Sequence, residues 1–130
     1  MDTILIVDRY LAIWNETDPD RRRALIAQTW AEDGRYTDPV FASAGHDEIE
    51  AMVGGFHGQF PGLRFVRTGE IEAHHDRIRF TWDLLDAGGA RQAAGTDVAV
   101  VTGDGRLLDV TGFFDLAPVL PDAVTEGAIA

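Results

Sequence analysis

Residues 77–84 read Arg-Ile-Arg-Phe-Thr-Trp-Asp-Leu, and apolar side chains alternate with polar ones through the whole stretch. An alternation with period two is typical of a β-strand with one buried face. The same period begins near residue 63 and is interrupted by turn sequences rich in Gly and Asp. We therefore expect four long strands joined by tight turns, at residues 63–73, 76–86, 91–102 and 106–116.

The first sixty residues follow a helical period instead. Apolar side chains between residues 3 and 16 recur every three or four positions, which predicts a helix with a broad apolar face. Asp18-Pro19 favours a helix start, and the second predicted helix runs to about Trp30, with Arg21–Arg23 as a solvated face. A third helix is expected over residues 47–59.

Three helices followed by a meander of antiparallel strands is an α+β plan. We expect a cone-shaped, curved antiparallel sheet packed around the three N-terminal helices, in a single domain over residues 1–116. Residues 117–130 are rich in Pro, Gly and small side chains, which predicts a poorly structured C-terminal tail. The hollow of such a cone suits an apolar ligand with a few polar anchors.

The composition narrows the classes of partner. The 130 residues carry a net charge of −11, which disfavours nucleic acid and anionic membranes as partners. The sequence contains no Cys, so disulfides, a thiolate nucleophile and a Cys-based zinc site are excluded. We expect a cytoplasmic protein without a metal or other cofactor.

Asp97 is the most informative single residue. It lies in a predicted strand whose residues are small or apolar on both faces, and its face is shared by Gly95 and Ala99. An isolated buried carboxylate protonates, pairs or meets a ligand, because removing a lone ion from water costs so much. Asp97 is therefore a candidate acid or base; the alternative is that it points outward or pairs with an Arg.

Five stretches of the sequence match a known pattern, and through them the chain resembles the SnoaL-like branch of the nuclear transport factor 2-like superfamily. The resemblance covers about residues 3–116 and implies a cystatin-like α+β roll, while the fold itself hosts many different activities. The matching stretches are Trp30–Pro39, Gly45–Ile49, Phe60–Leu63, Gly95–Asp97 and Asp104–Leu107, the last continuing toward Gly112–Asp115.

The resemblance implies roles for three residues. Polyketide cyclases of the SnoaL type use an acid/base Asp at the position of Asp97. Ketosteroid isomerases use a general base at the position of Asp38, and an oxyanion hole at the positions of Tyr10 and a protonated Asp97. Asp38 before Pro39 is also ordinary turn chemistry, and Tyr10 can equally fill the core.

A ligand in the hollow would contact apolar and aromatic walls. We expect substrate-binding positions at His57, Trp82, Phe56, Phe60 and Phe113.

Three hypotheses follow. The first is a cofactor-independent isomerase or cyclase, in which acid–base chemistry next to a carbonyl acts on a small hydrophobic molecule. The alternative is a binding or dimerisation domain without chemistry, with a homodimer formed through the outer sheet face. The third is epoxide-hydrolase-like water activation by an Arg next to carboxylates, because Arg79 and Asp83 share a strand face, as Arg91 and Asp97 do.

Overall fold

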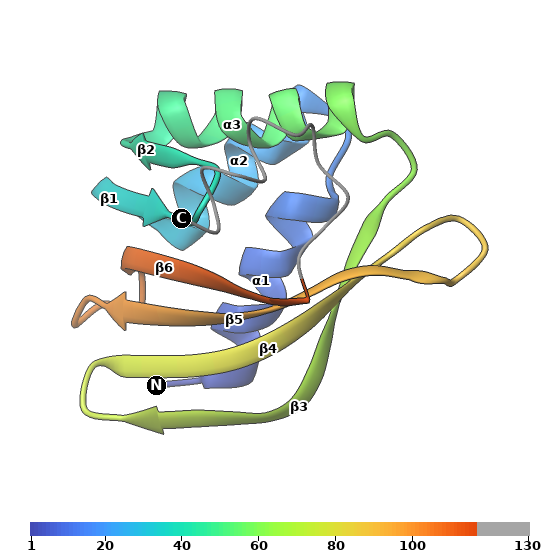
Figure 1. Cartoon of the computed structure of the whole chain (residues 1–130). Coiled ribbons are helices and arrows are strands. Elements are labelled where there is room, and N and C mark those ends of the chain that lie inside the picture. Colours follow the sequence, from blue (N-terminus) through green and yellow to red (C-terminus); the bar gives the residue numbers. More distant parts are fainter. Residues whose placement is uncertain (117–130) are drawn as a thin grey trace.

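The computed structural model describes residues 1–116, and these residues form three helices and one curved six-stranded sheet (Figure 1). The α+β class, the three N-terminal helices and the four long strands are confirmed, whereas the predicted tail at 117–130 lies outside the described residues. The elements are α1 Thr3–Asn15, α2 Pro19–Thr29, β1 Trp30–Thr37, β2 Ala42–Ala44, α3 His46–Gln59, β3 Arg64–His74, β4 Arg77–Leu85, β5 Arg91–Val101 and β6 Leu107–Leu116.

The sheet is mixed and not purely antiparallel, which corrects the expectation. Its strand order is β2-β1-β6-β5-β4-β3. The consecutive strands β3 to β6 pair antiparallel because short turns join them. β1 instead lies parallel to β6, with Tyr36 opposite Val110 and Thr37 opposite Thr111. The two strands are far apart in sequence, so no turn between them fixes their relative direction.

The first two helices begin at aspartate caps. Asp2 accepts a hydrogen bond from the backbone N–H of Leu5, and Asp18 accepts one from that of Arg21 at 2.9 Å. Pro19 occupies the first turn of α2, where its missing N–H leaves no bond unmade. The predicted start of the second helix is therefore confirmed in its chemistry.

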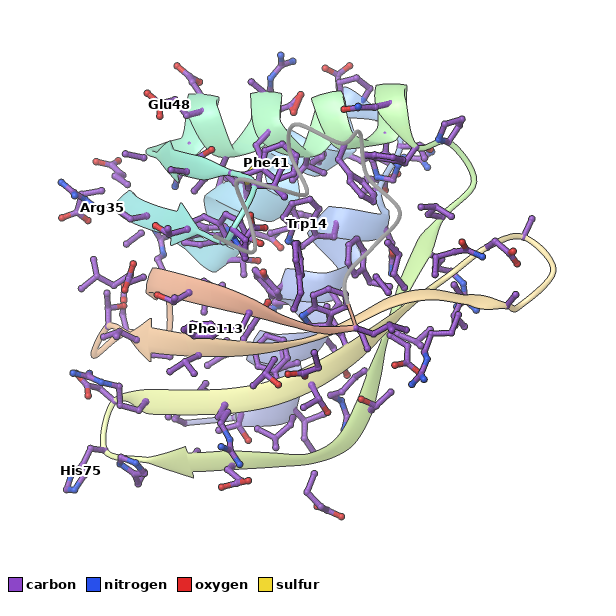
Figure 2. The ribbon with its side chains drawn as sticks, viewed as in Figure 1. Trp14, Arg35, Phe41, Glu48, His75 and Phe113 are labelled. Carbon is purple, nitrogen blue, oxygen red and sulfur yellow. The ribbon has the colours of Figure 1, made fainter. Side chains whose placement is uncertain are left out.

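The apolar core lies between the helices and the concave face of the sheet. α1 packs against β3 and α2, while α3 packs against α2 and covers β1 and β2 (Figure 1). Trp14 of α1 projects into the space between helices and sheet (Figure 2). Within residues 1–116, none of the helices is both long enough and apolar enough to cross a membrane.

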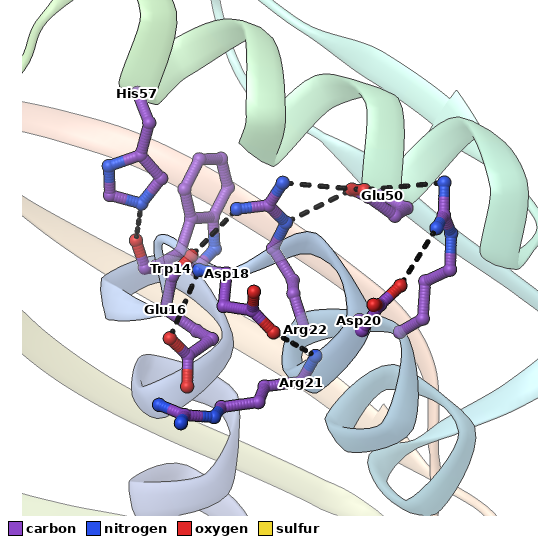
Figure 3. Close-up of polar contacts among 9 residues, drawn as sticks. Trp14, Glu16, Asp18, Asp20, Arg21, Arg22, Glu50 and His57 are labelled. Carbon is purple, nitrogen blue, oxygen red and sulfur yellow. Dashed lines mark hydrogen bonds and ion pairs between the residues drawn. The ribbon is translucent and has the colours of Figure 1, made fainter.

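A buried ion pair joins α2 to α3 and corrects the expectation of a solvated arginine run (Figure 3). Arg22 is only 2% exposed, and its Nε donates to Glu50 Oε2 at 3.0 Å. The same guanidinium also donates from Nη2 to Glu50 Oε1 at 3.3 Å and from Nη1 to the carbonyl of Glu16 at 2.7 Å. Helical spacing turned the middle residue of Arg21–Arg23 inward, while its two neighbours stay exposed.

Candidate functional site

A cavity of about 540 Å³ opens between α1, the end of α3 and the concave face of the sheet. Its volume lies in the range of small-molecule sites. Its walls are largely aromatic, from Trp14, Phe41, Phe56, Phe60, Phe65, Trp82 and Phe114. Its polar lining comes from Tyr10, Tyr36, Asp38, Gln59, Gln92 and Asp97.

Asp97 lies on the cavity side of β5 and is 2% exposed. Its Oδ2 accepts a hydrogen bond from the Tyr10 hydroxyl at 2.8 Å, and its Oδ1 accepts one from the Trp82 indole at 3.0 Å. Both donors are neutral, and among the ion pairs formed within residues 1–116 none involves Asp97. The carboxyl is therefore hydrogen-bonded but without a neutralising cation.

The surroundings of Asp97 set its affinity for a proton. Burial raises the pKa of Asp97 from its ordinary value of 3.8 to about 6. The hydrogen bonds from Trp82 and Tyr10 act in the opposite direction, because they stabilise the ionised form, while the charge of Asp38 adds to the rise. The group is thus able to gain and lose a proton close to neutral pH.

Tyr10 reaches the site from α1 and is buried against Phe80 and Trp30. Burial raises the pKa of Tyr10 well above its ordinary value, and the neighbouring Asp97 raises it further. The phenol therefore keeps its proton and acts as a hydrogen-bond donor. Tyr10 and Asp97 are therefore joined directly by a hydrogen bond in which the phenol is the donor.

Asp38 also lines the cavity, directly after β1. Its Oδ1 accepts from the backbone N–H groups of Val40 and Phe41, each at 2.7 Å, and its Oδ2 accepts from the Tyr36 hydroxyl at 2.5 Å. The carboxylate thus serves as a turn cap and faces the ligand space at once. Burial raises the pKa of Tyr36, so this second phenol also stays protonated.

Gly112 brings the two carboxyls together. It pairs with Asp97 across β5 and β6, and the parallel register that sets Thr37 opposite Thr111 brings Asp38 level with it. A Cβ at Gly112 would lie 2.8 Å from Asp97 Oδ1 and 3.3 Å from Asp38 Cβ. Glycine therefore leaves the space in which both acids converge.

Trp82, Phe56 and Phe60 line the cavity, as expected for its walls. His57 does not: its Nε2 lies 2.6 Å from the carbonyl oxygen of Trp14, where it links the end of α3 to α1 (Figure 3). His57 follows the buried Val53 by one helical turn, but this spacing alone does not determine the direction of the His57 ring.

Phe113 does not line the cavity either, which is a second correction. It is 56% exposed on β6, and its neighbour Phe114 occupies the wall (Figure 2). The register along β5 and β6 shifts near Leu108, because Val101 pairs with Leu107 but Val100 pairs with Asp109. One extra residue exchanges the faces of every following side chain.

Sequence reasoning missed Tyr36 and Gly112, although one signal for Tyr36 was available. Tyr36 precedes Asp38 by two positions, so an extended chain places both on one face. Gly112 carried no such signal, because its role depends on the pairing of β6 with β5 and on its position beside β1.

The arginines of the epoxide-hydrolase reading lie elsewhere. Arg79 pairs with Glu72 at 2.6 Å, and Arg91 lies 3.8 Å from Asp83; neither arginine lines the cavity. Water activation by an arginine between two carboxylates is therefore not supported. Over residues 1–116, there is no group of three or more His, Cys, Asp or Glu side chains arranged to hold a metal ion.

Comparison with known proteins identifies the family to which the chain belongs. A family model described as the SnoaL-like domain matches residues 7–110. The chain belongs to the SnoaL-like family. A solved SnoaL-like protein from Agrobacterium tumefaciens strain C58, provisionally named an isomerase, shares 43% identity with a TM-score of 0.84, over 86% of this chain and 96% of that one.

Two further solved structures, each less than 20% identical to this chain, share its fold and support the fold alone. A protein from Jannaschia sp. CCS1, provisionally named a SnoaL-like polyketide cyclase, is 17% identical with a TM-score of 0.64 and 85% coverage of each chain. A nuclear transport factor 2-like protein of unknown function from Exiguobacterium sp. 255-15 is 19% identical with a TM-score of 0.68, over 85% of this chain and 98% of that one. No curated protein sequence matches this SnoaL-like chain.

Proposed function

We propose that this SnoaL-like protein is a cofactor-independent isomerase or cyclase, which moves a proton next to the carbonyl group of a small hydrophobic molecule. The observation that carries the proposal is the setting of Asp97. It is a buried carboxyl with no cation beside it, in an aromatic cavity, with a pKa raised by burial to about 6. The name of the Agrobacterium relative, which is 43% identical to this chain, supports an isomerase.

In the proposed reaction, ionised Asp97 removes a hydrogen from the carbon next to the carbonyl. The C–H electron pair becomes the enolate double bond, the carbonyl π pair moves onto oxygen, and the proton forms an O–H bond with Asp97. Tyr10 donates to Asp97 before this step. As negative charge leaves the carboxylate for the enolate oxygen, the phenol becomes free to donate there, and a donor aimed at developing charge in a dry site contributes a few kcal/mol.

Two outcomes complete the reaction. If Asp97 returns its proton to a different carbon, the product is an isomer of the substrate. If the enolate carbon instead attacks a second carbonyl of the same molecule, a carbon–carbon bond closes a ring and the new alkoxide takes the proton. The choice between them depends on the substrate's shape.

The lining also selects substrates by charge. The cavity is lined by two carboxyls and two phenols, and its lining residues within 1–116 include no Arg or His. An anionic ligand would be repelled, so the proposal requires an uncharged carbonyl compound. The whole sequence contains no Lys, so the carbonyl cannot be activated as a lysine imine.

Asp38 is the less suitable base of the two. Three donors hold its oxygens, including the backbone amides of Val40 and Phe41. We propose that its role is electrostatic, because its charge raises the pKa of the neighbouring Asp97. It also holds Tyr36 as a second phenol near the carbonyl oxygen.

The test is hydrogen exchange in D₂O, because isomerase and cyclase share the enolate. A panel of neutral ketones, including β,γ-unsaturated cyclic ketones, is incubated with the protein, and loss of the α-hydrogen signal is followed by NMR. We expect exchange with at least one ketone and its loss in Asp97→Asn. Asp83→Asn, which changes a carboxyl outside the cavity lining, is the matched control and should exchange like wild type. Equal exchange by Asp97→Asn would contradict the proposal.

A second function is supported by the completeness of the hydrogen bonding. Every oxygen of Asp38 and Asp97 already accepts from a protein donor. Such satisfied groups suit a binding protein that only orients a ligand. Saturable ketone binding, seen as NMR shift changes in cavity residues and without any exchange in D₂O, would favour this alternative.

We also propose a homodimer through the outer face of the sheet. Phe113 is exposed there, and Val98 and Val100 are half-buried on the same face. Arg77, Val100 and Asp109 form one row across β4, β5 and β6. A two-fold axis along β5 would therefore set Arg77 of one copy over Asp109 of the other. Sedimentation should give a dimer for wild type and a monomer for Phe113→Asp; a wild-type monomer would contradict it.

A further inference from the structure

Trp82 does more than line the cavity wall. It lies opposite Gly95 in the register of β4 and β5, whereas Asp97 lies opposite Phe80. Its indole must therefore extend along β5 by two residues to donate from Nε1 to Asp97 Oδ1. This reach requires the ring to lie directly over the backbone at Gly95.

Gly95 provides the space for that reach. A Cβ at this position would lie 2.2 Å from Trp82 Cζ2 and 2.6 Å from Cε2, closer than any real contact. The backbone of Gly95 is not in the left-handed region, so its conformation does not call for glycine. Glycine is needed here because a side chain would collide with two neighbours. One is the indole of Trp82, and the other is the carbonyl oxygen of Phe113, which would lie 2.7 Å from the added Cβ.

Two aromatic rings hold the indole in this position. Phe65 packs against Trp82 with ring centroids 5.1 Å apart, and Phe114 with centroids 6.4 Å apart, both nearly edge-on. Trp82 is 6% exposed, so its ring has little room to rotate. The donor is thus fixed before any ligand enters.

The chemistry of the two partners of Asp97 differs. An indole N–H only donates, so the oxygen it faces must accept whether or not Asp97 carries a proton. A tyrosine hydroxyl donates or accepts, so Tyr10 can face either a bare oxygen or an O–H. A proton on Oδ1 would meet the indole N–H head-on, while a proton on Oδ2 meets a group able to accept it.

We propose that Trp82, placed over Gly95, is the positioning residue that directs the proton of Asp97 to Oδ2, the oxygen beside Tyr10. This inference deepens the proposed acid–base function by naming the oxygen that exchanges the proton. The titratable groups that face Asp97 are Tyr10 from α1, Tyr36 from β1 and Asp38 after β1. None of them offers Oδ1 the fixed donor that Trp82 supplies.

The test needs no substrate. In wild type, the Nε1–H resonance of Trp82 should shift with the same midpoint as the Asp97 carboxyl carbon, because the bond weakens when Asp97 is protonated. Trp82→Phe should raise the midpoint of Asp97 by about one pKa unit, as expected for the loss of a charge-assisted hydrogen bond. Phe60→Leu changes the cavity wall but leaves Trp82 and both of its packing partners in place, so its midpoint should stay within a few tenths of a unit of wild type.

Infrared spectroscopy locates the proton. The carbonyl stretch of protonated Asp97, isolated by subtracting Asp97→Asn, should move to higher frequency in Trp82→Phe, because the unprotonated oxygen loses its donor. An unchanged stretch, or a Trp82 resonance that ignores the titration of Asp97 in wild type, would overturn the inference. If α-hydrogen exchange fails while these couplings hold, the proposed activity is wrong and the positioning role stands.

Discussion

Two buried carboxyls in this protein have opposite environments. Glu50, on α3, is 8% exposed and accepts two hydrogen bonds from the buried guanidinium of Arg22 (Figure 3). A second cation is also near, because Arg23 Nη2 lies 3.9 Å from Glu50 Oε1. Asp97, on β5, is 2% exposed, and within residues 1–116 it accepts only from the neutral groups of Tyr10 and Trp82. Both acids are hydrogen-bonded, but only one is neutralised.

The difference separates a structural acid from a chemical one. A guanidinium stabilises the ionised form of the carboxylate paired with it. The Arg22–Glu50 pair therefore serves to link α2 to α3. A buried carboxyl that has neutral donors but no cation has a pKa closer to neutral pH, so it is able to exist with or without its proton.

The largest expected effect comes from the structural acid. Glu50→Gln leaves Arg22 buried without its counter-charge, and the free energy of unfolding should fall by about 3–5 kcal/mol. Urea unfolding at neutral pH measures it. The double variant Arg22→Met, Glu50→Leu should recover most of the loss, because it removes both charges. A loss below about 1 kcal/mol in Glu50→Gln would show that the pair is solvated.

Asp97→Asn should increase the free energy of unfolding at neutral pH, whereas Glu50→Gln lowers it. The native state holds the proton of Asp97 more tightly than the unfolded state, so this group's contribution to stability is fully present below about pH 3.8 and is lost as pH rises toward 6. The shift from 3.8 to about 6 corresponds to about 3 kcal/mol, at about 1.4 kcal/mol per unit. Asparagine has no charge to bury, so the variant should be more stable than wild type at pH 7.

Unfolding free energies at a series of pH values test this. The difference between Asp97→Asn and wild type should grow from pH 4 to pH 6 and then level off. Asp83→Asn, at a partly exposed surface pair, provides the comparison and should show no such growth. A constant difference over this range would mean that Asp97 does not titrate there.

Gly112→Ala should affect the place where the two acids converge. Its Cβ would lie 2.8 Å from Asp97 Oδ1 and 3.4 Å from the Tyr36 hydroxyl, which should cost about 1–3 kcal/mol of stability. Gly58→Ala, at an open position of α3, is the matched control and should be neutral or stabilising by up to about 1 kcal/mol. Thermal unfolding of both variants gives the comparison, and equal melting temperatures would contradict the close approach.

The smallest effect is expected at the second phenol. Tyr36→Phe removes one of three donors to Asp38 and should cost about 1 kcal/mol, because the two backbone donors remain. Denaturant unfolding checks the magnitude. A loss of several kcal/mol would mean that Asp38, like Glu50, depends on its partner for the fold.

Local chemistry was sufficient to predict the α+β class and the boundaries of most elements. The alternation around Trp82 and the cap at Asp18 depend on neighbours in sequence, and both are confirmed. β2 was missed because three residues are too few to show a period. The parallel pairing of β1 with β6 was missed because it joins distant segments.

The site was predictable in part for the same reason. Asp97, Asp38 and Tyr10 were found through the sequence pattern and the family resemblance, and all three line one cavity. Phe113 was placed on the wrong face because a single extra residue near Leu108 changes the phase of the strand. The burial of Arg22 depends on a helix, α3, that lies later in the chain.

The proton transfer proposed for Asp97 is tested most directly by titrating this residue itself, by carbon-detected NMR on wild type with labelled aspartate. We expect a midpoint at about pH 6, well above the ordinary value of 3.8, because the carboxyl is buried among neutral donors. A midpoint at or below 3.8 would show that solvent or a positive charge stabilises the carboxylate, and would contradict the proposed proton transfer at this residue.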